Sequence, residues 1–133
     1  MENVVFLSWD ELFILHEDQL RRYGGQQGFI DENVVRSVMS RAQFTSLYNA
    51  DADYADLAAD YLFGFATTQG FMDGNKRTAV VAALYFLSQN GYDLLITNRL
   101  LHLVSMSVAR GELDRDDLAH EIRAHMVAWE DEN

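Results

Sequence analysis

The chain has 133 residues, a net charge of −11, no cysteine and no proline. These values exclude disulfides and thiolate metal sites, and they disfavour broad attraction to nucleic acid, because that binding depends on neutralising phosphates with lysine and arginine. A local basic spot can still hold a small anion, and a basic partner peptide suits the acidic balance. The N-terminus lacks a signal-peptide pattern, and no apolar run approaches 18 residues. We therefore expect one cytoplasmic domain over residues 1–133, with no membrane span.

The first half of the chain is expected to form two helices joined by a glycine-rich loop. Ser8 and Glu11 have capping-box spacing at the start of the first helix, and Gly24–Gly25 ends it. Asp31 can cap the second helix. The expected inner faces are Trp9, Leu12, Phe13, His16, Leu20 and Tyr23 in the first helix and Val34, Val35, Val38 and Met39 in the second. Residues 43–53 show no clear period, so we expect a connection there.

The centre of the chain predicts two further helices. The third is expected over residues 54–68, and the fourth over residues 75–89 with Asn90–Gly91 as its stop signal. The inner face of the third helix is expected to consist of Leu57, Ala58, Tyr61, Leu62 and Phe65. The fourth helix contains "TAVVAALYFL", which is apolar nearly all round, so we expect this helix to be central and buried.

The last third predicts a short extended piece and two more helices. Residues 92–96 are expected to be extended, with residues 4–7 as a possible strand partner. Thr97 can cap a fifth helix, which runs through Val108. The sixth helix starts near "LDRDD", and its inner face is expected to be Leu118, Ile122, Met126 and Trp129. The predicted fold class is therefore all-α, with about six helices.

The turn before the fourth helix, "QGFMDGNKR" at residues 69–77, concentrates polar residues at a helix start. A helix N-terminus leaves backbone N–H groups unpaired and carries partial positive charge. Gly70 and Gly74 would let a ligand approach this backbone closely. Lys76 and Arg77 would add positive charge suited to phosphate oxygens. These features predict an anion site, with phosphate as the usual anion.

An acid and an amide accompany the two cations. Asp73 makes sense beside phosphate if it holds Mg²⁺, which typically uses one or two carboxylates plus phosphate oxygens. Asn75 would either donate to a phosphate or orient the loop. The alternative is that Asp73 caps the helix, Asn75 aids the turn, and both cations are solvated. Two cations at a first helical turn oppose the helix dipole, which favours a bound anion, although tertiary contacts would also explain them.

These residues resemble the motif of the Fic/Doc family, and specifically of the death-on-curing (Doc) toxins. The family pattern is His-x-Phe-x, an acid or Asn, Gly or Ala, and Asn, closed by Gly-Arg in Fic proteins and by Lys-Arg in the Doc branch. "QGFMDGNKRTA" matches it from Phe71 to Arg77. The segments "LHEDQLRRYGGQQGFID", "YLFGFATTQGF" and "ALYFLSQNGYDL" also resemble the family, so the likeness covers most of the chain.

The resemblance implies the compact helical Fic fold, with the central buried helix following the motif loop, and ATP-dependent chemistry on a protein hydroxyl. Most Fic proteins transfer AMP, whereas the Doc branch is similar to a kinase that phosphorylates a threonine of elongation factor Tu. Lys76 and Val80 stand where Fic enzymes have glycine and a second arginine, which favours the kinase type. The family also implies a Phd-like antitoxin segment that folds against the toxin. The net charge of −11 disfavours direct binding to nucleic acid, although the resemblance allows the toxin to join antitoxin–DNA complexes indirectly.

By position in the motif, the resemblance implies a role for each residue of the turn. Asp73 would bind magnesium, and Lys76 and Arg77 would stabilise charge on the transferring phosphoryl group of ATP. Phe71 would anchor the loop in the core. The nucleotide-binding set is expected to be Gly70, Gly74, Asn75, Lys76 and Arg77.

Gln69 departs from the family pattern, because it stands where the family has the histidine that accepts the proton of the target hydroxyl. A neutral amide cannot take a proton near neutral pH. Three explanations stay open: an engineered inactivating change, a natural non-catalytic module that binds nucleotide or a partner, or a base supplied elsewhere. AMP transfer is a further alternative. The histidines available as a substitute base are His16, His102, His120 and His125.

Overall fold

A computed structural model describes residue 1 and residues 3–130 of the chain. Within these residues it contains helices α1 (Trp9–Tyr23), α2 (Glu32–Tyr48), α3 (Tyr54–Ala66), α4 (Asn75–Gln89), α5 (Asn98–Ala109) and α6 (Arg115–His125). Two short strands, β1 (Tyr92–Leu94) and β2 (Met126–Ala128), pair antiparallel. The predicted all-α class is confirmed.

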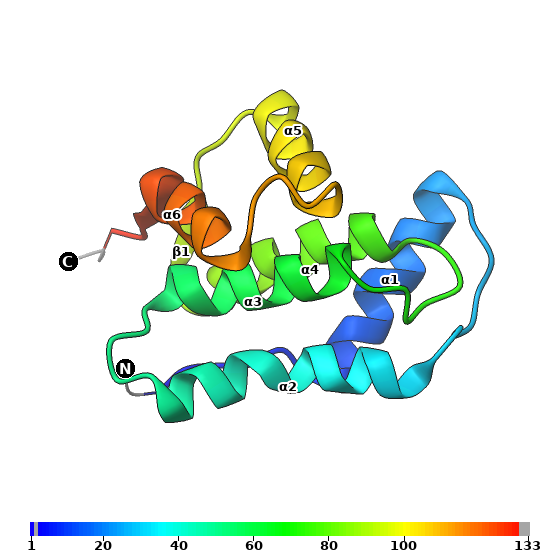
Figure 1. Ribbon diagram of the computed structural model, residues 1–133, viewed down its shortest axis with the longest axis horizontal. Coiled ribbons are helices and arrows are strands. Elements are labelled where there is room, and N and C mark those ends of the chain that lie inside the picture. Colours follow the sequence, from blue (N-terminus) through cyan, green and yellow to red (C-terminus); the bar gives the residue numbers. More distant parts are fainter. Residues whose placement is uncertain (2, 131–133) are drawn as a thin grey trace.

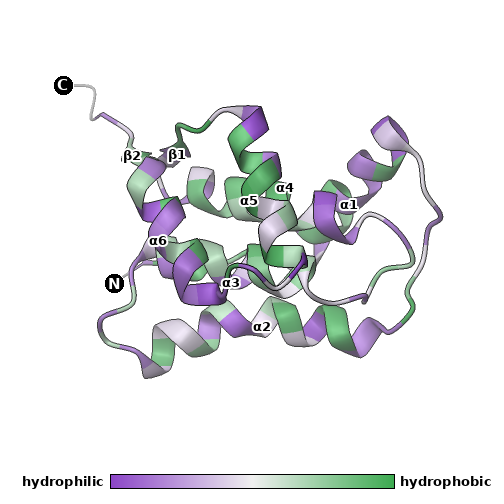
Figure 2. Ribbon diagram, turned by 45° about the horizontal axis from the view of Figure 1, so that its top comes forward, coloured by the Kyte–Doolittle hydropathy of each residue, from purple (hydrophilic) through white to green (hydrophobic). Residues whose placement is uncertain are grey.

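The helices are stacked around α3 and α4. In Figure 1, α2 lies along one side of this pair, α5 and α6 lie on the other, and α1 crosses its end. Hydrophilic and hydrophobic residues alternate along α2 in Figure 2, as expected of a helix with one buried face. The largest fully buried side chains include Tyr61, Phe65, Phe71 and Phe86. The core therefore lies directly behind the polar turn that starts α4.

Local signals at the helix starts agree with the structure. Ser8 and Glu11 form both bonds of the capping box of α1. Asp31 caps α2 through the N–H of Asn33, and Thr97 caps α5 through the N–H of Leu100. The five residues expected on the inner face of α3 are all buried. That helix ends at Ala66, two residues earlier than expected, and the hydroxyl of Thr68 donates to the carbonyl oxygen of Gly64.

Two expectations about elements were wrong at α2 and β1. Helix α2 continues through residues 43–48, where exposed Phe44, Leu47 and Tyr48 leave no apolar period to detect. Strand β1 pairs with β2 and not with residues 4–7. The backbone groups of residues 4–7 have side-chain partners instead: Asn90 bonds both the N–H and the carbonyl oxygen of Val5, and the N–H of Leu7 donates to the hydroxyl of Tyr61.

The other two corrections concern α6 and α4. Helix α6 ends at His125, so Met126 enters β2, and Trp129 is 54% exposed instead of lying on the inner face. Helix α4 is central, but it is not buried all round. Val80, Val81 and Leu84 on one of its faces line an open cavity.

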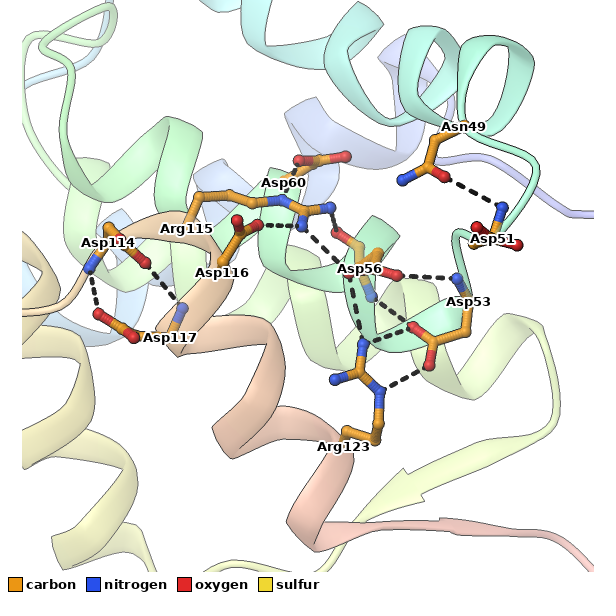
Figure 3. Close-up of polar contacts among 10 residues, drawn as sticks. All are labelled: Asn49, Asp51, Asp53, Asp56, Asp60, Asp114, Arg115, Asp116, Asp117 and Arg123. Atoms are coloured by element: carbon orange, nitrogen blue, oxygen red, sulfur yellow. Dashed lines mark hydrogen bonds and ion pairs between the residues drawn. The ribbon is translucent and has the colours of Figure 1, made fainter.

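An ion-pair cluster fastens α6 to α3 (Figure 3). Arg115 donates to Asp60 at 2.8 Å and to Asp56 at 3.0 Å. Arg123 donates to Asp53 at 2.7 Å, and this contact lowers the pKa of Asp53 to about 2. We call these five residues the α3–α6 cluster. It consumes two of the ten basic side chains of an acidic chain, so few cations remain for other sites.

Candidate functional site

The turn between α3 and α4 is held against the loop between α1 and α2 (Figure 1). The carbonyl oxygen of Gly70 accepts from the N–H groups of Ile30 and Asp31, at 2.9 and 3.0 Å. A Cβ added to Gly70 would lie 2.4 Å from Cγ2 of Val35. Gly70 is buried and does not line the cavity at this turn. The expectation that Gly70 admits a ligand is therefore corrected: its missing side chain admits α2.

Phe71 and His16 anchor the turn from below. Phe71 is 1% exposed, which agrees with the expected anchoring role, and its ring stacks on the His16 ring with 3.8 Å between centroids. Nε2 of His16 donates to the carbonyl oxygen of Asp73 at 2.8 Å, because a carbonyl can only accept. Burial is the main cause that lowers the pKa of His16. His16 is thus a packed residue that positions the turn.

The side chain of Asn75 braces the turn, as one of its two expected roles required. Its Oδ1 accepts from the N–H of Phe71 at 3.0 Å, and its Nδ2 donates to the carbonyl oxygen of the same residue at 2.9 Å. Gly74 precedes α4 with φ +81° and supplies no side-chain cap. The alternative that Asp73 caps the helix is therefore wrong.

The first turn of α4 keeps free backbone donors. The first intrahelical bond runs from the N–H of Thr78 to the carbonyl oxygen of Gly74 at 2.9 Å. Among the residues that the structure describes, none accepts from the N–H groups of Asn75, Lys76 or Arg77. Three donors and the positive end of the helix dipole therefore lie at this turn without a partner among the described residues.

Asp73 and Arg77 reach across to the glycine-rich loop after α1. Oδ2 of Asp73 accepts from the N–H of Gln26 at 2.7 Å. Arg77 donates to the carbonyl oxygens of Gln19 and Gly24, at 3.3 and 2.9 Å. These carbonyls belong to the negative end of α1, so a tertiary contact accounts for the position of this cation.

Lys76 differs from Arg77 in its surroundings. Its side chain is exposed, and within residues 3–130 it has no hydrogen-bond or ion-pair partner. Lys76 is thus the cation of the turn that is available to an incoming anion.

A cavity of about 1210 Å³ opens at this turn. Its polar end is lined by Gln69, Asp73, Gly74, Asn75, Lys76 and Arg77, so the structure brings together every expected site residue except Gly70. Its apolar walls are Val80, Val81 and Leu84 of α4 and Leu101, Met106 and Ala109 of α5. The arrangement can hold an anion at one end and an apolar group along the rest.

The structure distinguishes between the four histidines. His102 lines the cavity from α5, is exposed, and bonds to no other described residue. His16 is buried under the turn. His120 and His125 lie on α6, outside the cavity lining. Gln69 is exposed at the cavity wall, where its amide bonds to no other described residue.

The site offers one carboxylate to a metal ion. Among the residues that the structure describes, no three His, Cys, Asp or Glu side chains gather as a metal site. Asp73 is exposed and only its Oδ2 accepts a hydrogen bond, so Oδ1 is available to a cation that takes its other ligands from phosphate and water.

No helix in the described part of the chain has both the length and the apolar character to cross a bilayer.

The sequence did not predict that α1 contributes residues to the cavity. Gln19 and Tyr23 line the cavity beside Arg77, although they lie more than 50 residues before it. Tyr23 was expected to face the core, yet it is 68% exposed. The three glycines at 24, 25 and 28 were the available signal, since all have positive φ and a loop of that kind can lie close against another.

Comparisons with known proteins identify the family of this chain. Residues 6–87 match the model of the Fic/DOC family. The chain is 33% identical over 117 residues to "Protein kinase doc" of Escherichia phage P1, covering 88% of this chain and 92% of that protein. It is also 33% identical over 111 residues to "Toxin Doc" of Mycolicibacterium smegmatis (strain ATCC 700084 / mc(2)155), covering 80% and 84%. The chain therefore belongs to the Fic/DOC family, in the Doc toxin branch.

Proposed function

We propose that this protein is a Doc-type toxin built to transfer the γ-phosphoryl group of ATP to a threonine hydroxyl of a translation factor, elongation factor Tu. The names of its two relatives, a protein kinase and a toxin, support this reading. The observation that carries it is the first turn of α4, where three N–H groups and Lys76, all without a partner among the described residues, belong to residues that line one cavity. Donors fixed in this way stabilise charge on a transferring phosphoryl group without reorganising.

Each residue of the turn has a different proposed role. The N–H groups of Asn75, Lys76 and Arg77 and the ammonium of Lys76 would hold phosphate oxygens. Oδ1 of Asp73 would hold Mg²⁺, which neutralises phosphate charge when bound. Arg77 is held against α1 by two carbonyl oxygens, and from this position it would add positive charge to the phosphate site. Asn75 acts by keeping the turn in shape.

The transfer forms a bond between the threonine oxygen and the γ-phosphorus and breaks the bond from that phosphorus to the β–γ bridging oxygen. ADP leaves, and the hydroxyl proton must pass to a base or to water. Gln69 cannot accept it, and a general base typically contributes about 10²–10⁴-fold. We therefore propose weak or no turnover for this sequence. His102 is the histidine of the described chain that lines the cavity and is available for the role.

Gln69 also favours a second candidate, a non-catalytic module that binds nucleotide or a partner in the same cavity. A third candidate, AMP transfer, is disfavoured by Lys76 and Val80, which follow the Doc pattern of the motif.

A Phd-like antitoxin segment is the proposed regulator of this site. The apolar walls from α4 and α5 would take the apolar face of such a segment, as amphipathic peptides bind in grooves. The toxin would then act in the cytoplasm, on a protein target and without contacting nucleic acid directly.

A paired labelling assay tests the proposal. The protein and its Gln69→His variant are incubated with elongation factor Tu, magnesium and ATP labelled at either the α- or the γ-phosphate. We expect γ-label on the target with the variant and little or none with the original sequence. Label from α-labelled ATP would establish AMP transfer. Magnesium-dependent ATP binding with no label from either protein would establish the non-catalytic module.

A further inference from the structure

The end of the cavity next to α1 has a function not yet assigned. Gln19 and Tyr23 both line it, and they lie four residues apart, so they share one face of the helix. Arg77 reaches the same place, since it donates to the carbonyl oxygen of Gln19 and lies 5.7 Å from the centroid of the Tyr23 ring. The side chain of Arg77 therefore connects this end of the cavity to the first turn of α4, where the phosphates are proposed to bind.

Tyr23 offers a flat, accessible ring. It is 68% exposed, although α1 buries Leu20 only three residues earlier. The nearby guanidinium holds the ring through a cation–π contact. An aromatic ring held at the rim of a basic cavity is a platform on which a nucleobase can stack.

Gln19 supplies a hydrogen-bonding group without a protein partner. It is only 8% exposed, yet its side-chain amide bonds to no residue in the described part of the chain. Neither end of this amide is fully enclosed, in contrast to Oδ2 of Asp60 and Oγ1 of Thr78. A largely buried amide without a partner is costly, so it is expected to be satisfied from the cavity side, by water or by a ligand.

We propose that Gln19 and Tyr23 form the subsite for the purine base of the bound nucleotide. The base stacks on Tyr23, and the amide of Gln19, with one donor and one acceptor side, pairs with neighbouring donor and acceptor atoms on the purine edge. The triphosphate then runs past Arg77 to the first turn of α4. This inference rests on the proposed function for the phosphate end, and it adds the residues that recognise the base.

Binding measurements with and without the base test the subsite. ATP and inorganic tripolyphosphate are titrated calorimetrically, both with magnesium, into the original protein and into Tyr23→Ala, Tyr23→Phe and Gln19→Leu variants. Tyr48→Ala is the matched control, because Tyr48 is 78% exposed at the end of α2 and lies outside the cavity. Tyr23 and Tyr48 are exposed, and Gln19, although largely buried, does not belong to the hydrophobic core. Far-ultraviolet circular dichroism checks that each variant folds.

The expected result is selective. Tyr23→Ala weakens ATP binding by about 5- to 150-fold, the range for loss of one stacked base. Gln19→Leu weakens it on the order of fivefold. Tyr23→Phe and Tyr48→Ala leave it unchanged, and tripolyphosphate binds all five proteins equally.

Three results overturn the subsite. Equal loss of ATP and tripolyphosphate affinity in Tyr23→Ala means that Tyr23 acts through Arg77 and not on the base. Unchanged ATP affinity in Tyr23→Ala and Gln19→Leu means that the base lies elsewhere, while the proposed function stands. Failure of the original protein to bind either ligand removes both the proposed function and the subsite.

Discussion

The substitution Gly25→Ala tests the contact between the glycine-rich loop after α1 and the turn before α4. Comparison with Gly28→Ala distinguishes the effect of this contact from that of backbone strain alone. Gly25 has φ +126° and Gly28 has φ +105°, so alanine at either position costs about 1–3 kcal/mol of stability. The surroundings differ. A Cβ on Gly25 would lie 2.8 Å from Cδ2 of Leu20 and 3.0 Å from Cβ of Asp73, whereas a Cβ on Gly28 would meet nothing within 4 Å. Crowding adds about 1–3 kcal/mol at Gly25 alone.

The same substitution should also weaken nucleotide binding. Gly25 lies between the carbonyl oxygen that accepts from Arg77 and the N–H that donates to Asp73. Displacing this segment disturbs both residues, and we expect ATP affinity to fall by about tenfold, the order of one hydrogen bond to a charged group. Urea unfolding and calorimetric ATP titration measure the two effects, with Gly28→Ala as the control. The reasoning is refuted if the two variants match each other in both measurements.

Three further predictions concern catalysis, the α3–α6 cluster and pH. Gln69→His should raise phosphoryl transfer from γ-labelled ATP by about 10²–10⁴-fold, and an unchanged rate would show that the missing base is not what limits this site. Arg115→Met should cost at most about 3–5 kcal/mol of unfolding free energy, since it leaves the mostly buried carboxylate of Asp60 unpaired, whereas Asp56 keeps Arg123 as a partner; Arg22→Ala, which breaks an exposed pair, should cost about 1 kcal/mol or less in the same urea titration. The pKa of Asp53 is lowered from 3.8 to about 2 chiefly by Arg123, so its stabilisation is present above pH 3.8 and is lost as pH falls towards 2. Arg123→Gln should raise that pKa and flatten the acid limb of unfolding, and an unchanged carboxyl titration by NMR would argue against the assignment.

Elements that are defined by interactions between neighbouring residues were predicted correctly, whereas those defined by contacts between distant residues were not. The caps at Ser8, Asp31 and Thr97 act within three residues, so the pattern alone identifies them. The partner of β1 depends on a contact between residues more than 30 positions apart. Nothing in the alternation of residues 4–7 shows that the side chain of Asn90 bonds the backbone of Val5 instead.

The candidate site divides in the same way. Asp73, Gly74, Asn75 and Lys76 are adjacent in the chain, so their positions in one short motif are enough to place them together. The assignment of Gly70 failed because its missing side chain is required by Val35, a neighbour that only the fold reveals. The contribution of α1 could not be predicted either, since a polar helix end and a glycine loop are common at surfaces.

The two cations at the start of α4 therefore have different physical explanations. Both oppose the helix dipole, and the sequence alone treats them as one argument for a bound anion. Arg77 is stabilised by two carbonyl oxygens at the negative end of α1, so its presence would be reasonable in a protein that binds no anion. Lys76 has no such compensation among the described residues, and it stands next to three unpaired N–H groups at a cavity. The case for a phosphate site consequently depends on Lys76 and the helix terminus, and Lys76 is the cation whose removal should reduce triphosphate affinity without loosening the contact between α1 and α4.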